Sequence, residues 1–414
     1  MFRFAAADSR VWGVAIVGLV GMALLVGCAP GEDPQVAKAR TVLQAMVAQD
    51  QEYERYAMMI AEGSDSPEAT ERLLAGLGSD NFQTALVAVN ALGDEPPAES
   101  MEALRQVFEN KGGALKRSAA IQLGRLGDTE ALDYLKAQLS DPQQLLSIPT
   151  VVLIGATDEG GEFLAPILSE RLKSEDLGIR NEVYAALGEL KSPWATEIIV
   201  AGLGKEKGED RQQVIRALGR TGDPAMAGKI DRYANTQGLV FVTLQALGEL
   251  GNPESVKAVK PMVSNDSAPA RTYAAVALWK LGEKNDGVAA VNELIQDPDP
   301  TVRRMLAEQL ASIDDEEALS RLAALAEDGT KEVRVETLRA IAIKPRPEFE
   351  AVLVQAAGDS EYEVSTVALN MLAQVGRGSV VDQIAPLLDS ENPYVAISAA
   401  EAILSIRARE PATP

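Results

Sequence analysis

Few residues in this sequence carry side chains suited to covalent or acid–base chemistry at neutral pH. The 414 residues include one cysteine, Cys28, and no histidine. Without histidine the chain lacks the usual general base, the usual catalytic triads and histidine metal sites. Runs of carboxylates remain, such as 314–317 and 297–299. The first run lies at an expected helix start, where acids cap free amides, so we predict no enzyme activity, metal site or cofactor.

The position of Cys28 indicates a specific use for its thiol. An apolar run of sixteen residues, VWGVAIVGLVGMALLV, ends just before it, and Arg3 and Arg10 precede that run. A basic start, an apolar middle and a small residue at the end are typical of a secretory signal. Residues 25–28, LVGC, resemble the lipobox of bacterial lipoproteins, in which the peptide is cut before the cysteine and the thiol is lipidated.

This resemblance implies a signal peptide over residues 1–27 and a protein anchored through acyl chains on Cys28. Two or three acyl chains hold a protein stably on a membrane where one does not. The alternative is an uncleaved membrane span over residues 11–31, which approaches the roughly 20 residues that a span needs. Ala29 follows the cysteine. In families resembling Gram-negative lipoproteins, the absence of Asp there favours the outer membrane, facing the periplasm.

The net charge of −22 limits the partners of the chain. So acidic a protein repels phosphate backbones, and we therefore expect no nucleic-acid binding. A single cysteine also excludes disulfides within the chain.

The rest of the sequence repeats. A leucine or isoleucine, often within the motif ALG, recurs at steps of 29 to 33 residues. Its positions are Leu92, Leu123, Ile154, Leu187, Leu218, Leu247, Leu278, Leu310, Ile341, Leu372 and Ile403. In each unit, two segments place apolar residues three or four positions apart, as in NDGVAAVNELIQD and DPDPTVRRMLAEQLASI. This spacing predicts two amphipathic helices per unit, each burying its apolar face against the next pair.

The pattern resembles HEAT repeats, in particular the short repeats of phycobilisome lyases. The shared features are ALGxLGD at the end of the second helix and a basic residue seven positions before the leucine. The basic residues are Lys116, Arg180, Arg211, Arg271, Arg303 and Arg334. The resemblance implies an all-α fold, a right-handed α-solenoid of about eleven HEAT-like helix pairs. It also implies a ladder of hydrogen bonds from these bases to acids of neighbouring units, a structural role.

We predict four segments along the chain. After the signal peptide, residues 28–65 form the anchor, a linker and one long helix that caps the first repeat or serves as a stalk. Residues 66–407 form the solenoid and residues 408–414 a tail. Pro149 falls within an expected second helix and should shorten or kink it.

An apolar patch interrupts a row of mostly polar residues five positions before the repeat leucine. Val242, Tyr273 and Met305 occupy that row, with Phe241 and Val276 beside them, and Trp279 stands where other units have Gly or Ala. Aromatic anchors provide much of the energy of protein interfaces, so we predict that these six residues contact a partner. The alternative is that Trp279 and Tyr273 only fill a gap between repeats.

We therefore predict a lipid-anchored scaffold of the bacterial cell envelope that recognises a protein or peptide on the concave face of the solenoid. The alternatives are a carrier that holds a small cationic or pigment ligand in an acidic groove, and a structural spacer. Iron-dependent hydroxylases of this architecture need His-Glu motifs, which are absent. The sequence does not predict the oligomeric state.

Overall fold

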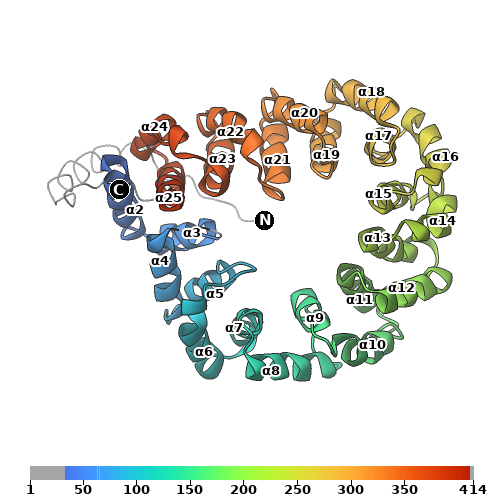
Figure 1. Cartoon of the computed structure of the whole chain (residues 1–414), viewed down its shortest axis with the longest axis horizontal. Coiled ribbons are helices and arrows are strands. Elements are labelled where there is room, and N and C mark those ends of the chain that lie inside the picture. Colours follow the sequence, from blue (N-terminus) through green and yellow to red (C-terminus); the bar gives the residue numbers. More distant parts are fainter. Residues whose placement is uncertain (1–32, 63, 65, 411–414) are drawn as a thin grey trace. The chain divides into compact units, whose positions relative to one another are not determined.

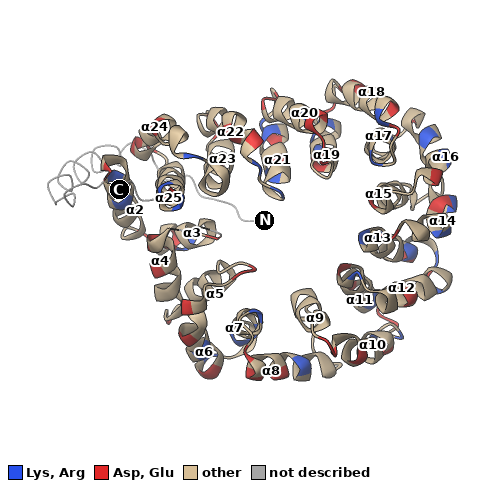
Figure 2. Cartoon of the chain, viewed as in Figure 1, with Lys and Arg blue, Asp and Glu red and all other residues tan. Residues whose placement is uncertain are grey.

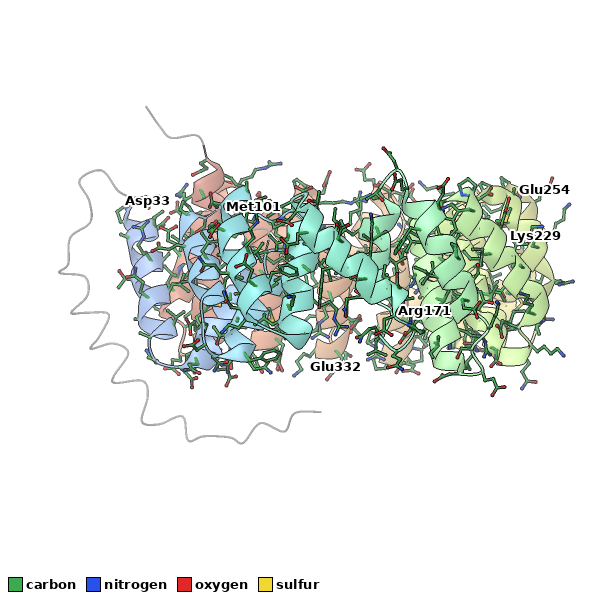
Figure 3. All side chains as sticks on the ribbon, turned by 90° about the horizontal axis from the view of Figure 1, so that it is seen from below. Asp33, Met101, Arg171, Lys229, Glu254 and Glu332 are labelled. Carbon is green, nitrogen blue, oxygen red and sulfur yellow. The ribbon has the colours of Figure 1, made fainter. Side chains whose placement is uncertain are left out.

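The computed structural model describes residues 33–62, 64 and 66–410, and Cys28 lies outside the described residues. Figure 1 shows α-helices joined by short loops, and the described residues contain no strand. Figure 3 shows from the side that the helices of each part of the molecule run roughly parallel or antiparallel to one another. None of the described helices has both the length and the apolar character needed to cross a membrane.

Eleven helix pairs follow one another over residues 67–409. The first helices are α4 (Pro67–Leu77), α6 (Met101–Asn110), α8 (Thr129–Ser140), α10 (Gly160–Arg171), α12 (Pro193–Lys205), α14 (Ala227–Ile230), α16 (Val256–Val259), α18 (Lys284–Ile295), α20 (Glu316–Ala326), α22 (Glu350–Ala357) and α24 (Val381–Ile384). The second helices are α5 (Phe82–Asn90), α7 (Gly113–Arg125), α9 (Ile148–Gly155), α11 (Leu177–Leu190), α13 (Arg211–Thr221), α15 (Val240–Leu250), α17 (Ala268–Lys280), α19 (Pro300–Leu310), α21 (Lys331–Ala342), α23 (Tyr362–Val375) and α25 (Pro393–Arg409). The predicted all-α solenoid of helix pairs is confirmed.

The ALG motif sets the spacing of neighbouring second helices. A β-carbon added to Gly188 would lie 3.0 Å from Cα of Ala217, and one added to Gly219 would lie 2.8 Å from Cα of Ala246. Real β-carbons do not come so close to a backbone, so the glycine of one unit lets the alanine of the next approach. The motif is therefore a packing contact between units.

The structure bears on two sequence predictions about helix ends. Helix α9 begins at Ile148, with Ser147 as its N-cap and Pro149 in its first turn, so the proline shortens the helix as predicted. Proline fits there because the first turn has no intrahelical N–H bond to lose. Helix α25 continues to Arg409, two residues into the predicted tail.

The chain divides into two compact units. Unit 1 contains the chain up to Ser118 together with everything from Ile341 onward, and unit 2 is Ala119–Ala340. The first and last repeats thus belong to the same unit, which the repeat pattern does not predict.

In unit 1 the segment before the first repeat forms two helices, α2 (Pro34–Val47) and α3 (Gln51–Ile60), and the prediction of one long helix is wrong. The break follows from Asp50, whose side chain accepts a hydrogen bond from the amide of Glu52 at 2.8 Å and so starts a new helix. Helix α2 packs on α25, and α3 packs on both α25 and α5. This additional pair joins the last repeat to the first.

Polar groups buried at this junction pair across it. Arg72 of α4 forms an ion pair with Glu401 of α25, whose side chain is almost completely buried. Ser64 and Ser405 share a hydrogen bond of 2.5 Å between their hydroxyl oxygens. These contacts fix the position of α25 in unit 1. Any packing that left the buried charge unpaired would cost several kcal/mol.

Candidate protein-binding face

The second helices α11, α13, α15, α17 and α19 lie side by side on the concave side of unit 2 (Figure 1). We call their exposed surface the inner face. It combines a pair of aromatic side chains with a cleft that carries charges of both signs.

The aromatic pair consists of Phe241 on α15 and Tyr273 on α17. Their rings are stacked with 5.9 Å between centroids and 21° between planes. Phe241 is 44% exposed and Tyr273 is half-buried. Burial and the carboxylate of Glu308 raise the pKa of Tyr273, and Arg216 opposes this rise. The structure therefore brings together two of the six predicted contact residues, from neighbouring units, at an accessible position.

Three other predicted contact residues are buried, so Val242 and Val276 are wrongly assigned to a partner surface, whereas Trp279 lines the cleft described below with little exposed area. Val242 is 6% exposed, Val276 4% and Trp279 5%. The prediction assumed that the position five before the repeat leucine faces solvent in every unit. On α15 the exposed position is one residue earlier, at Phe241, and the next side chain points into the core. The last predicted residue, Met305 on α19, is half-buried.

Trp279 takes the position that glycine holds in the preceding units, and its indole packs between repeats. The cations of Lys284 and Arg321 lie 6.0 and 5.6 Å from the centroid of its ring. Gly287 of α18 packs on its backbone, where an added β-carbon would lie 2.8 Å from the Trp279 nitrogen. Trp279 thus fills a gap between repeats, and it also lines the cleft described next.

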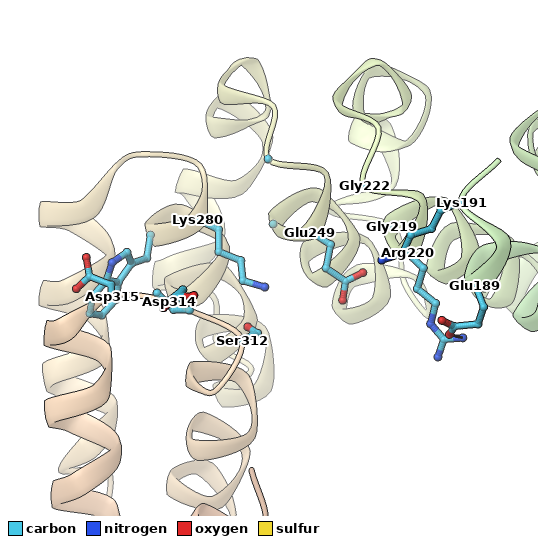
Figure 4. A pocket seen from close by; sticks show the side chains of 14 residues that line it. Glu189, Lys191, Gly219, Arg220, Gly222, Glu249, Lys280, Ser312, Asp314 and Asp315 are labelled. Atoms are coloured by element: carbon cyan, nitrogen blue, oxygen red, sulfur yellow. Dashed lines mark ion pairs between the residues drawn. The ribbon is translucent and has the colours of Figure 1, made fainter. Parts of the chain in front are cut away.

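A cleft of about 720 Å³ lies at the carboxyl ends of α11, α13, α15 and α17 (Figure 4). Four of its lining residues stand two positions after the repeat leucine in consecutive units. These are Glu189, Arg220, Glu249 and Lys280. These four residues were not predicted as a site, although the alternation of charge at one repeat position is visible in the sequence.

The four charged groups differ in how they are paired. Arg220 and Glu189 form an ion pair of 2.9 Å. Glu249 accepts a hydrogen bond from Gln245 at 3.0 Å, and no hydrogen bond or ion pair of Lys280 occurs within the described residues. Figure 4 shows that Glu249 and Lys280 both point into the cleft. A ligand group can therefore reach both.

Burial makes both of these charges costly. It raises the pKa of Glu249, and it lowers the pKa of Lys280, while each charge partly offsets the effect on the other. A desolvated charge without a close partner gains free energy when a ligand supplies one. The pair is thus suited to a polar group that both accepts and donates hydrogen bonds, such as a peptide unit.

The cleft is not the acidic groove expected from the composition. Its lining contains the acids Glu189, Glu249, Asp314 and Asp315 and the bases Lys191, Arg220 and Lys280. Figure 2 shows both signs of charge on the helices of unit 2. A mixed surface favours specific pairing with a partner over simple attraction of cations.

The carboxylate run 314–317 has the predicted capping role. Asp315 is the N-cap of α20 and accepts a hydrogen bond from the amide of Glu317 at 2.9 Å. Lys284 lies 2.8 Å from the same carboxylate. Within the described ranges, no group of three or more acids or cysteines is arranged to hold a metal ion.

The predicted ladder of basic residues is structural, as its hydrogen bonds show. Four members donate to the backbone carbonyl six residues earlier, which fixes the loop between the two helices of a pair. These are Arg180, Arg271, Arg303 and Arg334.

Three rungs of the ladder also cross to the next unit. Arg303 lies 2.7 Å from Asp328, Arg180 lies 3.1 Å from Glu206, and Arg271 lies 3.8 Å from Asp297. Asp328 and Glu206 accept hydrogen bonds, whereas Arg271 and Asp297 form an ion pair only. Asp176 and Asp299 cap their own helices instead.

Two predicted members of the ladder make different contacts. The cation of Arg211 lies 5.0 Å from the centroid of the Tyr233 ring, and Arg211 also donates to the carbonyl of Leu203. The ammonium of Lys116 lies 4.4 Å from the centroid of the Phe108 ring. Both contacts are cation–π interactions, which stabilise the packing without an acid.

Comparison with protein families identifies HEAT repeats in two segments, residues 70–147 and 264–342. No curated protein sequence matches the chain. These two segments are therefore HEAT repeats, in agreement with the resemblance stated for the sequence.

Among solved structures, the chain is similar to the complex of CpcE and CpcF of phycocyanin lyase from Nostoc, at 17% identity over 73% of this chain and 92% of that chain, with a TM-score of 0.26. It is similar to human deoxyhypusine hydroxylase in complex with glycerol, at 20% identity over 61% of this chain and 98% of that chain, with a TM-score of 0.27. It is also similar to the Kap95:Nup1 complex, at 11% identity over 91% of this chain and 63% of that chain, with a TM-score of 0.34.

Proposed function

We propose that this protein is a lipid-anchored scaffold of the bacterial cell envelope that binds a protein or peptide on the inner face of unit 2. The observation that supports this most directly is the stacked pair of Phe241 and Tyr273 at an exposed position. Exposed aromatic pairs are typical anchors of protein interfaces, because they bury much area at little cost in conformational entropy. A HEAT-repeat scaffold suits such a role.

The cleft lies further along the same two helices, where Glu249 and Lys280 stand eight and seven residues after Phe241 and Tyr273, and it supplies a polar part of the inner face. Glu249 and Lys280 face it without pairing to each other directly. A partner could pack an apolar side chain on Phe241 and place a polar group between these two charges. It would then cover the aromatic pair and pair the charges at the same time. Aromatic anchors surrounded by polar contacts are the usual anatomy of a specific interface.

Substitution of the exposed ring tests this assignment. Phe241→Glu is expected to weaken partner binding roughly 30-fold, the equivalent of about 2 kcal/mol, because it places a charge in the centre of the contact. The measurement is quantitative mass spectrometry of proteins that co-purify with the detergent-solubilised protein. Phe82→Glu, at a ring of similar exposure on α5, is the matched control. Equal loss of a co-purifying protein in both variants, or loss in neither, would contradict the proposal.

The membrane anchor rests on the sequence around Cys28. Helix α2 begins six residues after this cysteine, and six extended residues reach at most about 20 Å. An anchored protein would therefore keep the start of α2 close to the bilayer. The absence of Asp after the cysteine favours the outer membrane, with the repeats in the periplasm.

Cys28→Ser tests the anchor. The natural protein is expected to partition into the detergent phase and to carry acyl chains on its first residue, whereas the variant should retain its signal peptide and carry no lipid. Intact-mass spectrometry distinguishes these species. A natural protein of full length with an unmodified cysteine would instead support the uncleaved span.

A carrier function is the second candidate, and the volume of the cleft favours it. About 720 Å³ lies within the range of small-molecule sites. A small molecule retained by the purified protein in native mass spectra, and released by Lys280→Ala, would support this function over protein binding.

A further inference from the structure

Four of the eight tyrosines of the chain gather at one place in unit 1. Tyr394, in the first turn of α25, is the centre of this tyrosine patch. Its ring centroid lies 4.9 Å from that of Tyr56 and 5.6 Å from that of Tyr53, both edge-to-face, and 6.3 Å from that of Tyr362, nearly parallel. The patch therefore joins α3, α23 and α25.

Hydrogen bonds hold two of the four rings in place. The hydroxyl of Tyr394 donates to Glu52 at 2.5 Å, and the hydroxyls of Tyr56 and Ser398 lie 2.8 Å apart. The rings are thus preorganised, and a ligand would not need to order them.

The patch remains accessible to solvent. Tyr362 is 44% exposed, and the other three tyrosines are half-buried. The core of this unit is otherwise mainly aliphatic, with the buried rings of Phe108 and Phe349, and only 4% of the whole chain is aromatic. A cluster of exposed rings at one position is the kind of surface that marks an interaction site.

Acids surround the patch. Within three positions of the four tyrosines the sequence has one base, Arg55, and seven acids, which are Asp50, Glu52, Glu54, Asp359, Glu361, Glu363 and Glu391. Burial raises the pKa of Tyr53, and so do the carboxylates of Asp50 and Glu52. Burial also raises the pKa of Tyr394, together with Glu52. The rings thus lie in a field of negative charge.

We propose that the tyrosine patch binds arginine side chains of a basic segment in a partner protein. A guanidinium stacks on aromatic faces and pairs with carboxylates at the same time, and the patch offers both groups side by side. The net charge of −22 also raises the local concentration of basic partners. This surface lies in unit 1 and is independent of the inner face of unit 2.

A capped hexa-arginine peptide is the probe, titrated calorimetrically into the mature lipidated protein in neutral detergent at low salt. Tyr362→Ala is expected to weaken binding roughly 5- to 30-fold, the equivalent of about 1–2 kcal/mol for a cation–π contact. Tyr362→Phe keeps the ring and should bind like the natural protein. Phe241→Ala, at a ring of equal exposure in unit 2, should also leave the affinity unchanged.

Three results would overturn the proposal. Tyr362→Ala binding as tightly as the natural protein would show that attraction to the acidic chain as a whole accounts for the affinity. Equal loss in Phe241→Ala would place the peptide elsewhere. Loss in Tyr362→Phe would mean that the hydroxyl, and not the ring face, makes the contact.

Discussion

Arg72→Ala is expected to lower the free energy of unfolding by about 3–5 kcal/mol, because it leaves a buried carboxylate without its ion-pair partner. Arg72 is the ion-pair partner of Glu401, which is 1% exposed on α25. Without the guanidinium, a carboxylate stays buried with no compensating charge. Denaturant unfolding followed by circular dichroism measures the change, and hydrogen exchange of the α25 amides locates it.

The loss should depend on pH. Burial raises the pKa of Glu401, and Arg72 opposes that rise, so its removal raises the pKa further. A carboxyl group with a raised folded-state pKa favours folding at low pH and loses that contribution as pH rises through the raised value. The defect of Arg72→Ala should therefore be smaller near pH 4.5 than at pH 7. Arg339 forms a 3.9 Å ion pair with Glu336, and its side chain is 63% exposed. Arg339→Ala should therefore change the free energy of unfolding little. An equal change in both variants would contradict the role of Arg72.

Arg303→Ala is expected to cost about 2–3 kcal/mol, because it removes charge-assisted hydrogen bonds between neighbouring units. Arg303 donates to both carboxylate oxygens of Asp328, at 2.7 and 3.0 Å, and to the carbonyl of Asp297 at 2.7 Å. Thermal or denaturant unfolding measures the loss. The adjacent Arg304 is exposed and forms no ion pair within the described residues. Arg304→Ala is therefore the matched control, with an expected change below about 0.5 kcal/mol.

The stability loss of Arg303→Ala should also depend on pH, through a carboxyl group whose pKa is lowered and not raised as in Glu401. Burial alone would raise the pKa of Asp328, but the hydrogen bond from Arg303 and the amide of Thr330 outweigh it and lower the pKa. A lowered carboxyl pKa stabilises the fold above the unfolded value of 3.8 and is lost as pH falls through the folded value. The difference between natural protein and Arg303→Ala should therefore shrink below pH 3.8. A difference that persists unchanged at pH 2 would show that packing of the side chain, and not its charge, matters.

Periodicity made the repeat architecture predictable. The recurring ALG motif brings Gly219 close to Ala246, and the same contact recurs between Gly188 and Ala217. The junction of the first and last repeats could not be predicted in this way. Arg72 and Glu401 are separated by most of the chain, and nothing local to either residue indicates the other.

The candidate site was predictable only in part. The interruption of polarity around Tyr273 led to the aromatic pair, but on α15 the phase of the helix relative to Leu247 differs by a residue from that on α17, where Tyr273 is accessible. That shift buries Val242 and exposes Phe241. The tyrosine patch was missed for a further reason: Tyr53 and Tyr394 come from opposite ends of the repeat array, and only the fold brings them together.

Photo-crosslinking in cells tests the central claim most directly. A photoreactive amino acid replaces Phe241 on the inner face in one variant, and Glu197, an exposed residue of the first helix α12, in the other. We predict one dominant protein adduct from position 241, absent from position 197 and reduced by Lys280→Ala. Adducts that are the same from both positions, or none from position 241 when the protein is folded and lipidated, would contradict partner binding on the inner face.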